Sequence, residues 1–472
     1  MRTRGWAWRP GLFNACAFAF AKFPSRPYDA AVRTTLKVSR ILHAGYLFEC
    51  GGTRVVFDPI FENPFSRNCF AYPDVAIDPS GLGKVDAVFI SHYHDDHFSL
   101  VSLDRFDRAT PIYFYCVHEE LFELLREMGF SEVFALELGG AIDVGEIRVT
   151  PKLALDPDVD SIFHVSAADV NVLNVVDSWI DPLTLESLAK LAPWDLVLWP
   201  FQTMQEIEVL SPARALPASR SVPEEWLNQL ALLQPRAVVP SSCQFIQETW
   251  SWYRTAYFPI SYAGFESQLR ERLPETKCVR LDPGGSVEVS TPGLAPSERL
   301  EWIEPRGPQA VDYEYDPRPV GTGEIAKHFP PLTEAQTARV LEFCRNELSA
   351  RLAELPPPSN PFFADARPWG LTLYDHEGRR FEFSWILDGT QLLPLSGRAP
   401  EWRTELPIQK LYAALKDGES LSSMYVRINE GQFPPHVERT LAEADIMEDP
   451  LLRALFNGKI GSYQKAQLAH LR

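Results

Sequence analysis

The sequence predicts a layered α/β domain that is followed by a smaller α+β region. From about residue 36 to residue 290, short apolar runs alternate with amphipathic segments, the pattern of buried strands joined by helices. Between 291 and 332 the composition becomes proline-rich, and from 333 onward the pattern changes in kind. Since 472 residues exceed one ordinary core, we expect an N-terminal segment (1–35), an α/β domain (36–290), a linker or wrapping segment (291–332) and a C-terminal α+β domain (333–472).

The α/β part contains candidate strands and helices in alternation. The candidate strands are the apolar runs at 46–50, 54–58, 87–91, 112–116, 147–150, 161–166, 170–176, 196–200 and 237–240. Candidate helices span 118–128, 183–191, 224–233 and 261–272, and prolines at 182, 223 and 259 precede the last three, as is common at helix starts. Gly51-Gly52 joins the first two strands and is a hairpin signal, so we expect a mixed sheet.

The C-terminal part begins with a long helical period at 333–355, which the proline-rich stretch PPPSNP at 356–361 ends. A hairpin is predicted at 371–387. Further elements are expected at 407–415 (helix), 423–428 (strand) and 450–457 (helix). This part of the sequence contains no cluster of histidine, cysteine or acidic residues that we identify as a site, so no site is predicted there.

The charge balance limits the partners that this chain would bind. A net charge of −18 disfavours nucleic acid and anionic membrane surfaces, because both are negatively charged themselves. A small-molecule substrate is the expected partner. Seven cysteines occur without any CxxC pair, so neither a disulfide framework nor a thiolate zinc site is indicated, and a reducing, cytoplasmic setting fits best.

The N-terminal segment has arginines before the apolar stretch at 11–21, a weak likeness to a signal peptide that Asn14 interrupts. We prefer a short helix that packs on the main domain. No apolar run approaches the ~18 residues of a membrane span.

The most informative stretch is HYHDDH at 92–97, directly after the predicted strand at 87–91. It holds three of the chain's 10 histidines within six positions, together with aspartates. A loop that follows a strand can aim several such side chains at one point, and imidazole and carboxylate are ligands of zinc, iron and manganese. The alternative is a solvated polar turn, which the density of histidines disfavours. The stretch therefore predicts a metal site.

HxHxDH after a strand resembles the signature of the metallo-β-lactamase superfamily, matched here by His92, His94, Asp96 and His97. HAGYLFECGGTRVVFDP at 43–59 is similar to the opening hairpin of that fold. The resemblance covers about 36–290 and implies an αββα sandwich that holds two metal ions. His92 and His94 would bind one ion, Asp96 and His97 the second, and Asp177, at the end of VLNVVDS, would bridge them. A helix N-cap after the strand is the alternative role for Asp177.

The chain departs from the superfamily pattern at the next ligand. The third histidine is expected some twenty residues before Asp177, but the only nearby candidate is His164, inside the apolar run SIFHVS. LALDPDVDS offers Asp156, Asp158 and Asp160 instead. Position favours Asp156 or Asp160 as a carboxylate replacement, and His164 stays an alternative.

The last superfamily histidine is also missing, because no histidine occurs between 165 and 327. His328 could reach the site only through a special arrangement, so loss of this ligand is the simpler interpretation. The segment in its place presents Ser241, Ser242 and Gln244, which are predicted to line the pocket or hold water.

With two histidines and one carboxylate, the first metal position would have the donor set of non-haem iron oxygenases. Fewer imidazoles and more carboxylates favour iron, with zinc or manganese as alternatives. Within the superfamily, the substitution resembles the di-iron β-hydroxylase of chloramphenicol biosynthesis. AVVPSSCQFIQ and LDPGGSVEV are similar to CMP-N-acetylneuraminate hydroxylase, although this chain lacks the cysteine and histidine pairs of that enzyme's Rieske domain. An external electron donor would therefore be needed.

Three functions follow as hypotheses. The first is a di-iron oxygenase or hydroxylase that acts on a small molecule. The second is a metal-dependent hydrolase of a phosphoester, amide or lactone, in which the catalytic Asp96 orients a bridging hydroxide. The third is a binding or scaffold protein with a degenerate site.

Two residues of the opening hairpin are candidates for supporting roles. His43 is predicted to lie near the metal pocket, with a purely structural histidine as the alternative. Asp58 could accept a hydrogen bond from a ligand histidine, a role that metal sites commonly need, or it is simply a turn residue before a proline.

Overall fold

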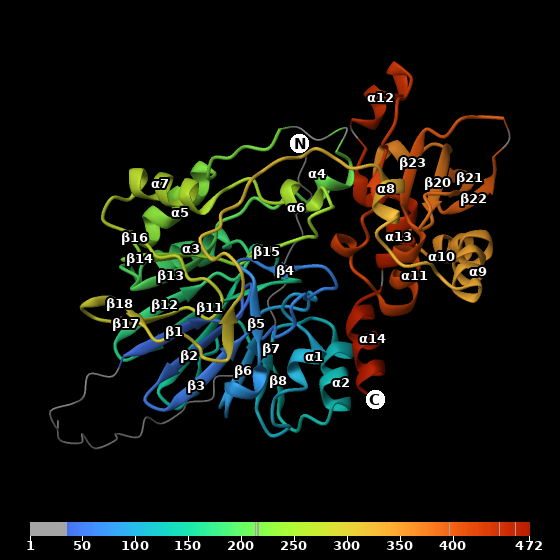
Figure 1. Ribbon diagram of the computed structural model, residues 1–472. Coiled ribbons are helices and arrows are strands. Elements are labelled where there is room, and N and C mark those ends of the chain that lie inside the picture. The colour runs from blue at the N-terminus through green and yellow to red at the C-terminus, as the bar shows by residue number, and fades with distance from the viewer. Residues whose placement is uncertain (1–34, 213, 215–216, 396, 443, 458) are drawn as a thin grey trace, which may run out of the picture. The chain divides into compact units, whose positions relative to one another are not determined.

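Two facing β-sheets form the α/β part of the protein (Figure 1). The computed structural model describes residues 35–212, 214, 217–395, 397–442, 444–457 and 459–472, so the predicted N-terminal helix lies outside the described residues. The first sheet has eight strands in the order β18-β17-β1-β2-β3-β6-β7-β8. They are β1 (Leu36–Arg40), β2 (Tyr46–Cys50), β3 (Thr53–Phe57), β6 (Ala87–Ile90), β7 (Ile112–Phe114), β8 (Val133–Ala135), β17 (Ser286–Ser290) and β18 (Gly293–Ser297).

The second sheet has seven strands in the order β16-β14-β13-β12-β11-β10-β9. They are β9 (Ile142–Val144), β10 (Ile147–Leu153), β11 (Ser161–Ala167), β12 (Val170–Asn174), β13 (Leu196–Pro200), β14 (Ala237–Ser241) and β16 (Lys277–Cys278). Both sheets are mixed. The predicted hairpin is present, because β2 and β3 pair antiparallel and both linking glycines have a positive φ that disfavours other residues.

The core between the sheets is made of side chains from both. Phe57 of β3 stacks on Phe89 of β6, with ring centroids 5.3 Å apart, and meets Phe163 of β11 at 5.0 Å across the sandwich. Burial of these apolar faces holds the two sheets together.

Helices cover the outer face of each sheet, which completes the αββα sandwich predicted above (Figure 1). One side carries α1 (Leu100–Leu103) and α2 (Glu119–Glu127), and the other carries α3 (Pro182–Ala189), α5 (Glu224–Leu233) and α7 (Tyr262–Arg272). Shorter elements also occur between residues 70 and 326: β4 (Phe70–Ala71), β5 (Val75–Ile77), α4 (Glu206–Leu210), β15 (Phe245–Ile246), α6 (Tyr253–Ala256), β19 (Ile303–Pro305) and α8 (Thr322–Ala326).

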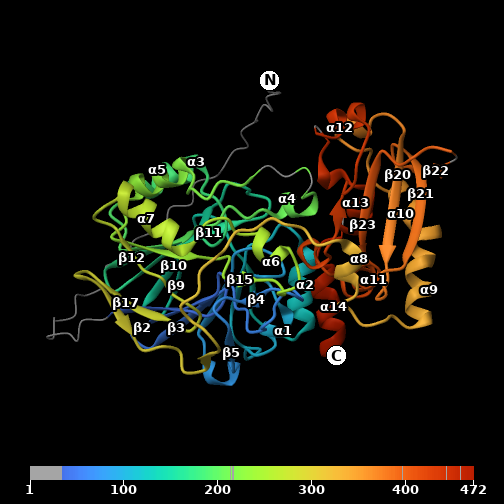
Figure 2. The ribbon, with the colours of Figure 1, turned by 45° about the horizontal axis from the view of Figure 1, so that its top comes forward.

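The C-terminal region has a sheet of its own, in the order β22-β21-β20-β23-β24, with a separate hydrophobic core. Its strands are β20 (Arg367–Tyr374), β21 (Arg380–Asp388), β22 (Gln391–Pro394), β23 (Trp402–Pro407) and β24 (Arg427–Ile428). Its helices are α9 (Glu334–Glu342), α10 (Leu348–Ala353), α11 (Ile408–Asp417), α12 (Pro435–Leu441), α13 (Pro450–Phe456) and α14 (Ser462–Leu471). The last helix lies against α1 and α2 of the sandwich (Figure 2).

Several element boundaries differ from the predictions. The helix predicted at 333–355 contains a π-helical turn, Phe343–Glu347, between α9 and α10. The strand predicted at 423–428 is limited to β24, because a 3-10 turn occupies Leu421–Ser423. The first sheet continues past residue 290, since β18 forms a hairpin with β17. No helix of the described residues is both long enough and apolar enough to span a membrane.

Strand direction places the functional loops together. β3 and β6 are parallel neighbours in the first sheet, and β12, β13 and β14 are parallel neighbours in the second. Parallel strands end at the same edge of a sheet, so the loops that follow them meet at one end of the sandwich.

Candidate metal centre

The HYHDDH loop follows β6 and forms a tight turn. The carbonyl of His94 accepts hydrogen bonds from the backbone N–H groups of His97 (3.1 Å) and Phe98 (2.8 Å). His92 and His97 are buried, whereas His94 is exposed. The turn therefore points its polar side chains toward the edge where the loops of both sheets meet.

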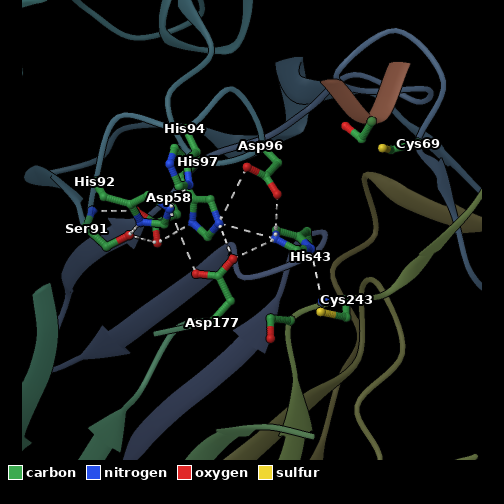
Figure 3. A network of polar contacts seen from close by, with 12 residues as sticks. His43, Asp58, Cys69, Ser91, His92, His94, Asp96, His97, Asp177 and Cys243 are labelled. Carbon is green, nitrogen blue, oxygen red and sulfur yellow. Dashed lines mark hydrogen bonds and ion pairs between the residues drawn. The ribbon is translucent and has the colours of Figure 1, made fainter. Parts of the chain in front are cut away.

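One group of potential ligands consists of His43, Asp96, His97 and Asp177, whose ligand atoms all lie within 4.8 Å of one another (Figure 3). His97 Nε2 is 2.9 Å from Asp177 Oδ2 and 3.8 Å from Asp96 Oδ1. These three side chains come from the loops after β6 and β12, and the superfamily pattern predicts them as ligands of one metal.

A second group lies beside it. His92 Nε2 and His94 Nδ1 are 3.0 Å apart, a separation that two nitrogens bound to one ion at about 2.1 Å would adopt. Asp160 Oδ1 lies 3.7 Å from His92 Nδ1, and Asp177 Oδ1 lies 4.0 Å from His92 Nε2. Asp177 therefore faces both groups, as expected for a bridging carboxylate.

Asp58 controls the hydrogen bonding of two candidate ligands. Its buried carboxylate accepts bonds from the backbone N–H (2.7 Å) and the hydroxyl (2.8 Å) of Ser91, and it lies 3.2 Å from His97 Nδ1. The Ser91 hydroxyl in turn lies 2.9 Å from His92 Nδ1. Since Nδ1 of each imidazole can donate toward Asp58 or Ser91, Nε2 of both is left free to bind a metal.

His43 is placed differently from a ligand, although it belongs to the first group. The backbone N–H of Cys243 donates to His43 Nδ1 at 3.1 Å, so a neutral His43 carries its proton on Nε2. Nε2 lies 3.2 Å from Asp96 Oδ2 and 3.7 Å from Asp177 Oδ2. His43 is thus a hydrogen-bond donor to the carboxylates rather than a lone-pair donor to a metal.

The loops around the site have a strained backbone. His43, Asp58, Val176, Ser242 and Cys243 all have φ between +40° and +62°, a region that side chains other than glycine disfavour. The buried Arg40 guanidinium stabilises two of these loops, because it donates to the carbonyls of His43 (2.6 Å) and Pro240 (2.8 Å). Strain of this kind is maintained where a side chain must be held in one place.

The electrostatics fit bound cations. Burial alone would lower the pKa of His97, but the carboxylates of Asp177 and Asp96 hold it well above its usual range. Burial and the neighbouring Asp177 raise the pKa of Asp160 to about 6. Among the described residues, no lysine or arginine forms an ion pair with Asp96, Asp160 or Asp177, so only the histidines balance these carboxylates. Buried carboxylates need a positive partner, which divalent ions at these two groups would supply.

Several predicted residues lie elsewhere. Asp156 is exposed, and its carboxylate caps the local turn by accepting the N–H of Asp158, so Asp160 is the aspartate of this loop that reaches the site. His164 lies on β11, where Nε2 contacts Asn171 at 2.8 Å. His328 stacks on Trp250.

Ser241, Ser242 and Gln244, which were predicted to line the pocket, lie outside the cavity lining. Ser241 lies 2.8 Å from the Tyr46 hydroxyl, the Ser242 hydroxyl donates to the carbonyl of Ser241, and the Gln244 amide donates to the carbonyl of Leu281. All three are buried, and none lines the cavity beside the metal residues. The tight turn at Ser242 and Cys243 directs Phe245 into the cavity in their place.

The C-terminal region completes the surroundings of the site, which the sequence did not indicate. The Gln464 amide of α14 donates to the carbonyls of Tyr93 (3.2 Å) and Phe98 (3.1 Å), the two ends of the HYHDDH turn. Gln467 accepts the backbone N–H of Leu100 at 2.8 Å. Both glutamines are buried. A helix more than 360 residues away in the chain therefore braces the loop that carries most of the candidate ligands.

A two-sheet αββα sandwich with an HxHxDH loop and a bridging aspartate at one edge defines a protein of the metallo-β-lactamase fold with a candidate metal centre. Residues 37–242 match the family model described as the beta-lactamase superfamily domain. The α/β part of this chain thus has the fold that its motif predicted.

Known proteins with sequence similarity have names of different kinds. A UPF0173 protein from Pyrococcus furiosus is 24% identical over 209 residues, which cover 40% of this chain and 87% of that protein. A UPF0173 metal-dependent hydrolase from Haloquadratum walsbyi is 28% identical over 108 residues, covering 23% of this chain and 40% of that protein. Cytidine monophosphate-N-acetylneuraminic acid hydroxylase from Cricetulus griseus is 25% identical over 170 residues, covering 33% of this chain and 30% of the hydroxylase.

Among solved structures, CmlA, a diiron beta-hydroxylase from Streptomyces venezuelae, matches with a TM-score of 0.37 and 14% identity. The match covers 56% of this chain and 55% of that one. Relatives named as hydrolases and as hydroxylases thus both occur.

Proposed function

We propose that this protein is a dinuclear metal enzyme that oxidises a small molecule, as a non-haem di-iron oxygenase or hydroxylase. The observation that carries the proposal is the position of Asp160, which stands where the superfamily pattern has a histidine: its carboxylate lies 3.7 Å from Nδ1 of His92 and lines the same cavity as His92 and His94. Two imidazoles and one carboxylate are the donor set of non-haem iron oxygenases, whereas zinc enzymes generally have more nitrogen donors.

His92, His94 and Asp160 would hold one ion, Asp96 and His97 the other, and Asp177 both. Bound there, iron ions would supply redox chemistry with dioxygen, whereas zinc ions would supply hydrolytic chemistry.

The protein's own residues prepare the site for either ion. Asp58 and Ser91 face Nδ1 of His97 and His92, so the neutral form of each imidazole carries its proton on Nδ1 and offers Nε2 to an ion. His43 donates to Asp96 and so orients a carboxylate that lines the cavity, which makes Asp96 the proposed catalytic residue.

The similarity to a hydroxylase supports the proposal, although the alignment spans less than a third of that protein. Because the sequence lacks the cysteine and histidine pairs of a Rieske cluster, electrons would come from a separate donor protein. The described cysteines are free thiols, which suits a reducing cytoplasm.

The test is metal analysis of the purified protein together with O2 consumption in the presence of a chemical reductant. We expect about two irons per chain, an absorption feature that disappears on reduction, and O2 uptake. Asp160→His should raise the zinc-to-iron ratio, and Asp156→Ala, a change in the same loop, should leave it unaltered. Protein that carries zinc and hydrolyses simple esters would overturn the oxygenase proposal.

The second candidate is a metal-dependent hydrolase of a phosphoester, amide or lactone. The names of the UPF0173 relatives favour it. Hydrolysis of p-nitrophenyl esters or phosphates that depends on added zinc, and that Asp96→Asn abolishes, would establish it instead. Absence of bound metal would leave the scaffold hypothesis.

A further inference from the structure

A cavity of about 540 Å³ adjoins the candidate metal centre, and its walls come from two distant parts of the chain. One wall belongs to the sandwich and includes His92, His94, Asp96, Asp160 and Asp177. The other belongs to the C-terminal region, between residues 418 and 464. A volume of this size is typical of small-molecule sites.

The sandwich wall presents polar atoms that the protein itself does not pair. Tyr257 is 1% exposed and lines the cavity, and its hydroxyl has no hydrogen-bond partner among the described residues. Oδ2 of Asp95 also lacks a hydrogen-bond partner among the described residues, while the carboxyl group as a whole interacts with Ser420 and Ser66. Glu206, beside Tyr257, also lines the cavity, and burial followed by the charge of Asp96 raises its pKa to about 7. Buried polar groups are almost always hydrogen-bonded, so these atoms point to a polar ligand.

The C-terminal wall carries an apolar patch among polar side chains. Leu421, Phe456, Ile460 and Tyr463 form the patch, and Met204 and Phe245 of the sandwich extend it, whereas Ser420, Ser422 and Ser462 line the same wall. The patch suits a hydrocarbon or aromatic body, which would leave water when it binds.

Lys459 is the one cationic side chain of the described cavity lining, which otherwise contains five carboxylates. Its ammonium group forms no ion pair with a carboxylate of the described residues. Lys459 is exposed at the apolar wall, between Phe456 and Ile460. It is therefore free to pair with a negative group on a ligand that packs against this wall.

We propose that the cavity binds an amphipathic organic anion, whose apolar body packs on Leu421, Phe456 and Ile460 and whose negative group pairs with Lys459. The end of the ligand that reaches the sandwich wall accepts the Tyr257 hydroxyl and lies next to the metal residues. The inference rests on the proposed function in one respect, namely that the end of the ligand beside the metal residues is the part that reacts. The C-terminal region, in which no site was predicted, is then the part of the protein that selects the substrate.

The test uses two fluorescent probes that differ in charge. 8-Anilinonaphthalene-1-sulfonate carries a sulfonate, and N-phenyl-1-naphthylamine has the same aromatic body without it. Titration of the full chain is done with and without a chelator, so that metal binding by the sulfonate is separated from binding to the cavity. Lys459→Met should lower the affinity for the anionic probe about fivefold, as expected for a partly exposed ion pair. The affinity for the neutral probe should stay within twofold. Lys190→Met removes another exposed, unpaired lysine outside the cavity and should change neither.

A cavity-filling variant tests the location. Leu421→Trp should lower the affinity for both probes at least tenfold, and circular dichroism should show an unchanged fold. The proposal is overturned if Lys459→Met affects both probes equally or neither, or if Leu421→Trp leaves both affinities unchanged. Neither measurement involves turnover, so zinc in place of iron would refute the oxygenase proposal without altering these results.

Discussion

Replacement of Asp58 by asparagine tests how the site prepares its histidines. The carboxylate is 0% exposed and faces three donors: the N–H and hydroxyl of Ser91 and Nδ1 of His97. In Asp58→Asn the amide oxygen can still accept the Ser91 N–H, but the new NH2 group then faces His97 Nδ1. His97 must therefore become an acceptor at Nδ1 and carry its proton on Nε2. Nε2 is the atom that lies 2.9 Å from Asp177, so a proton there blocks metal binding.

The expected loss is about tenfold to hundredfold in affinity for one of the two ions, or about 1.4–2.7 kcal/mol, the range for hydrogen-bond partners of ligand histidines. Competition with a chromophoric chelator measures it, and thermal unfolding confirms that the variant is folded. Ser91→Ala is the comparison variant: it removes the contact to His92 and one donor to Asp58, but it leaves the Asp58 carboxylate as the acceptor for Nδ1 of His97, so the proton of His97 should stay on Nδ1. If Asp58→Asn binds both ions with unchanged affinity, the tautomer argument is wrong.

Three further outcomes are expected. Gln464→Leu removes both hydrogen bonds to the ends of the HYHDDH turn. Metal affinity should therefore fall up to tenfold, and amide exchange at 93–98 should accelerate. His470→Ala on the same helix should alter neither quantity. Chelation of the metals should lower the unfolding temperature, because ions bind the folded state, and at a concentration 100 times Kd they stabilise it by about 2.7 kcal/mol; an unchanged temperature contradicts a resident metal. The pKa of His97 is raised in the metal-free fold, so the stability that its protonation contributes is complete below about 6.5 and is lost as pH rises through the raised value. The same protons compete with the ion, so affinity should fall on acidification, and His97→Gln should flatten the pH dependence of metal-free unfolding.

Local sequence signals predicted much of the α/β framework. α5 and β13 have the predicted bounds, because a proline precedes the helix and the strand is a continuous apolar run. α14 went unpredicted for the opposite reason. Its inward face carries Gln464 and Gln467 as well as Leu468, so no apolar period marks it, and its glutamines become buried only because a distant loop offers them partners.

The candidate site divides in the same way. HYHDDH and the aspartate after VLNVV are recognisable because their spacing along strands and turns is local. The choice between Asp156 and Asp160 cannot be read from local spacing, since it depends on how one loop folds. Asp156 closes the turn, and Asp160 extends from it toward His92.

By itself, the sequence determined the fold class, the HxHxDH motif and the carboxylate-rich character of the candidate site, all of which depend on residues close together in the chain. The tertiary structure alone decided that His43 donates rather than ligates, because its Nδ1 meets the Cys243 N–H from a loop 200 residues away. It also decided that the C-terminal region forms half of the cavity and braces the motif, because contacts between residues several hundred positions apart leave no periodic trace in either segment.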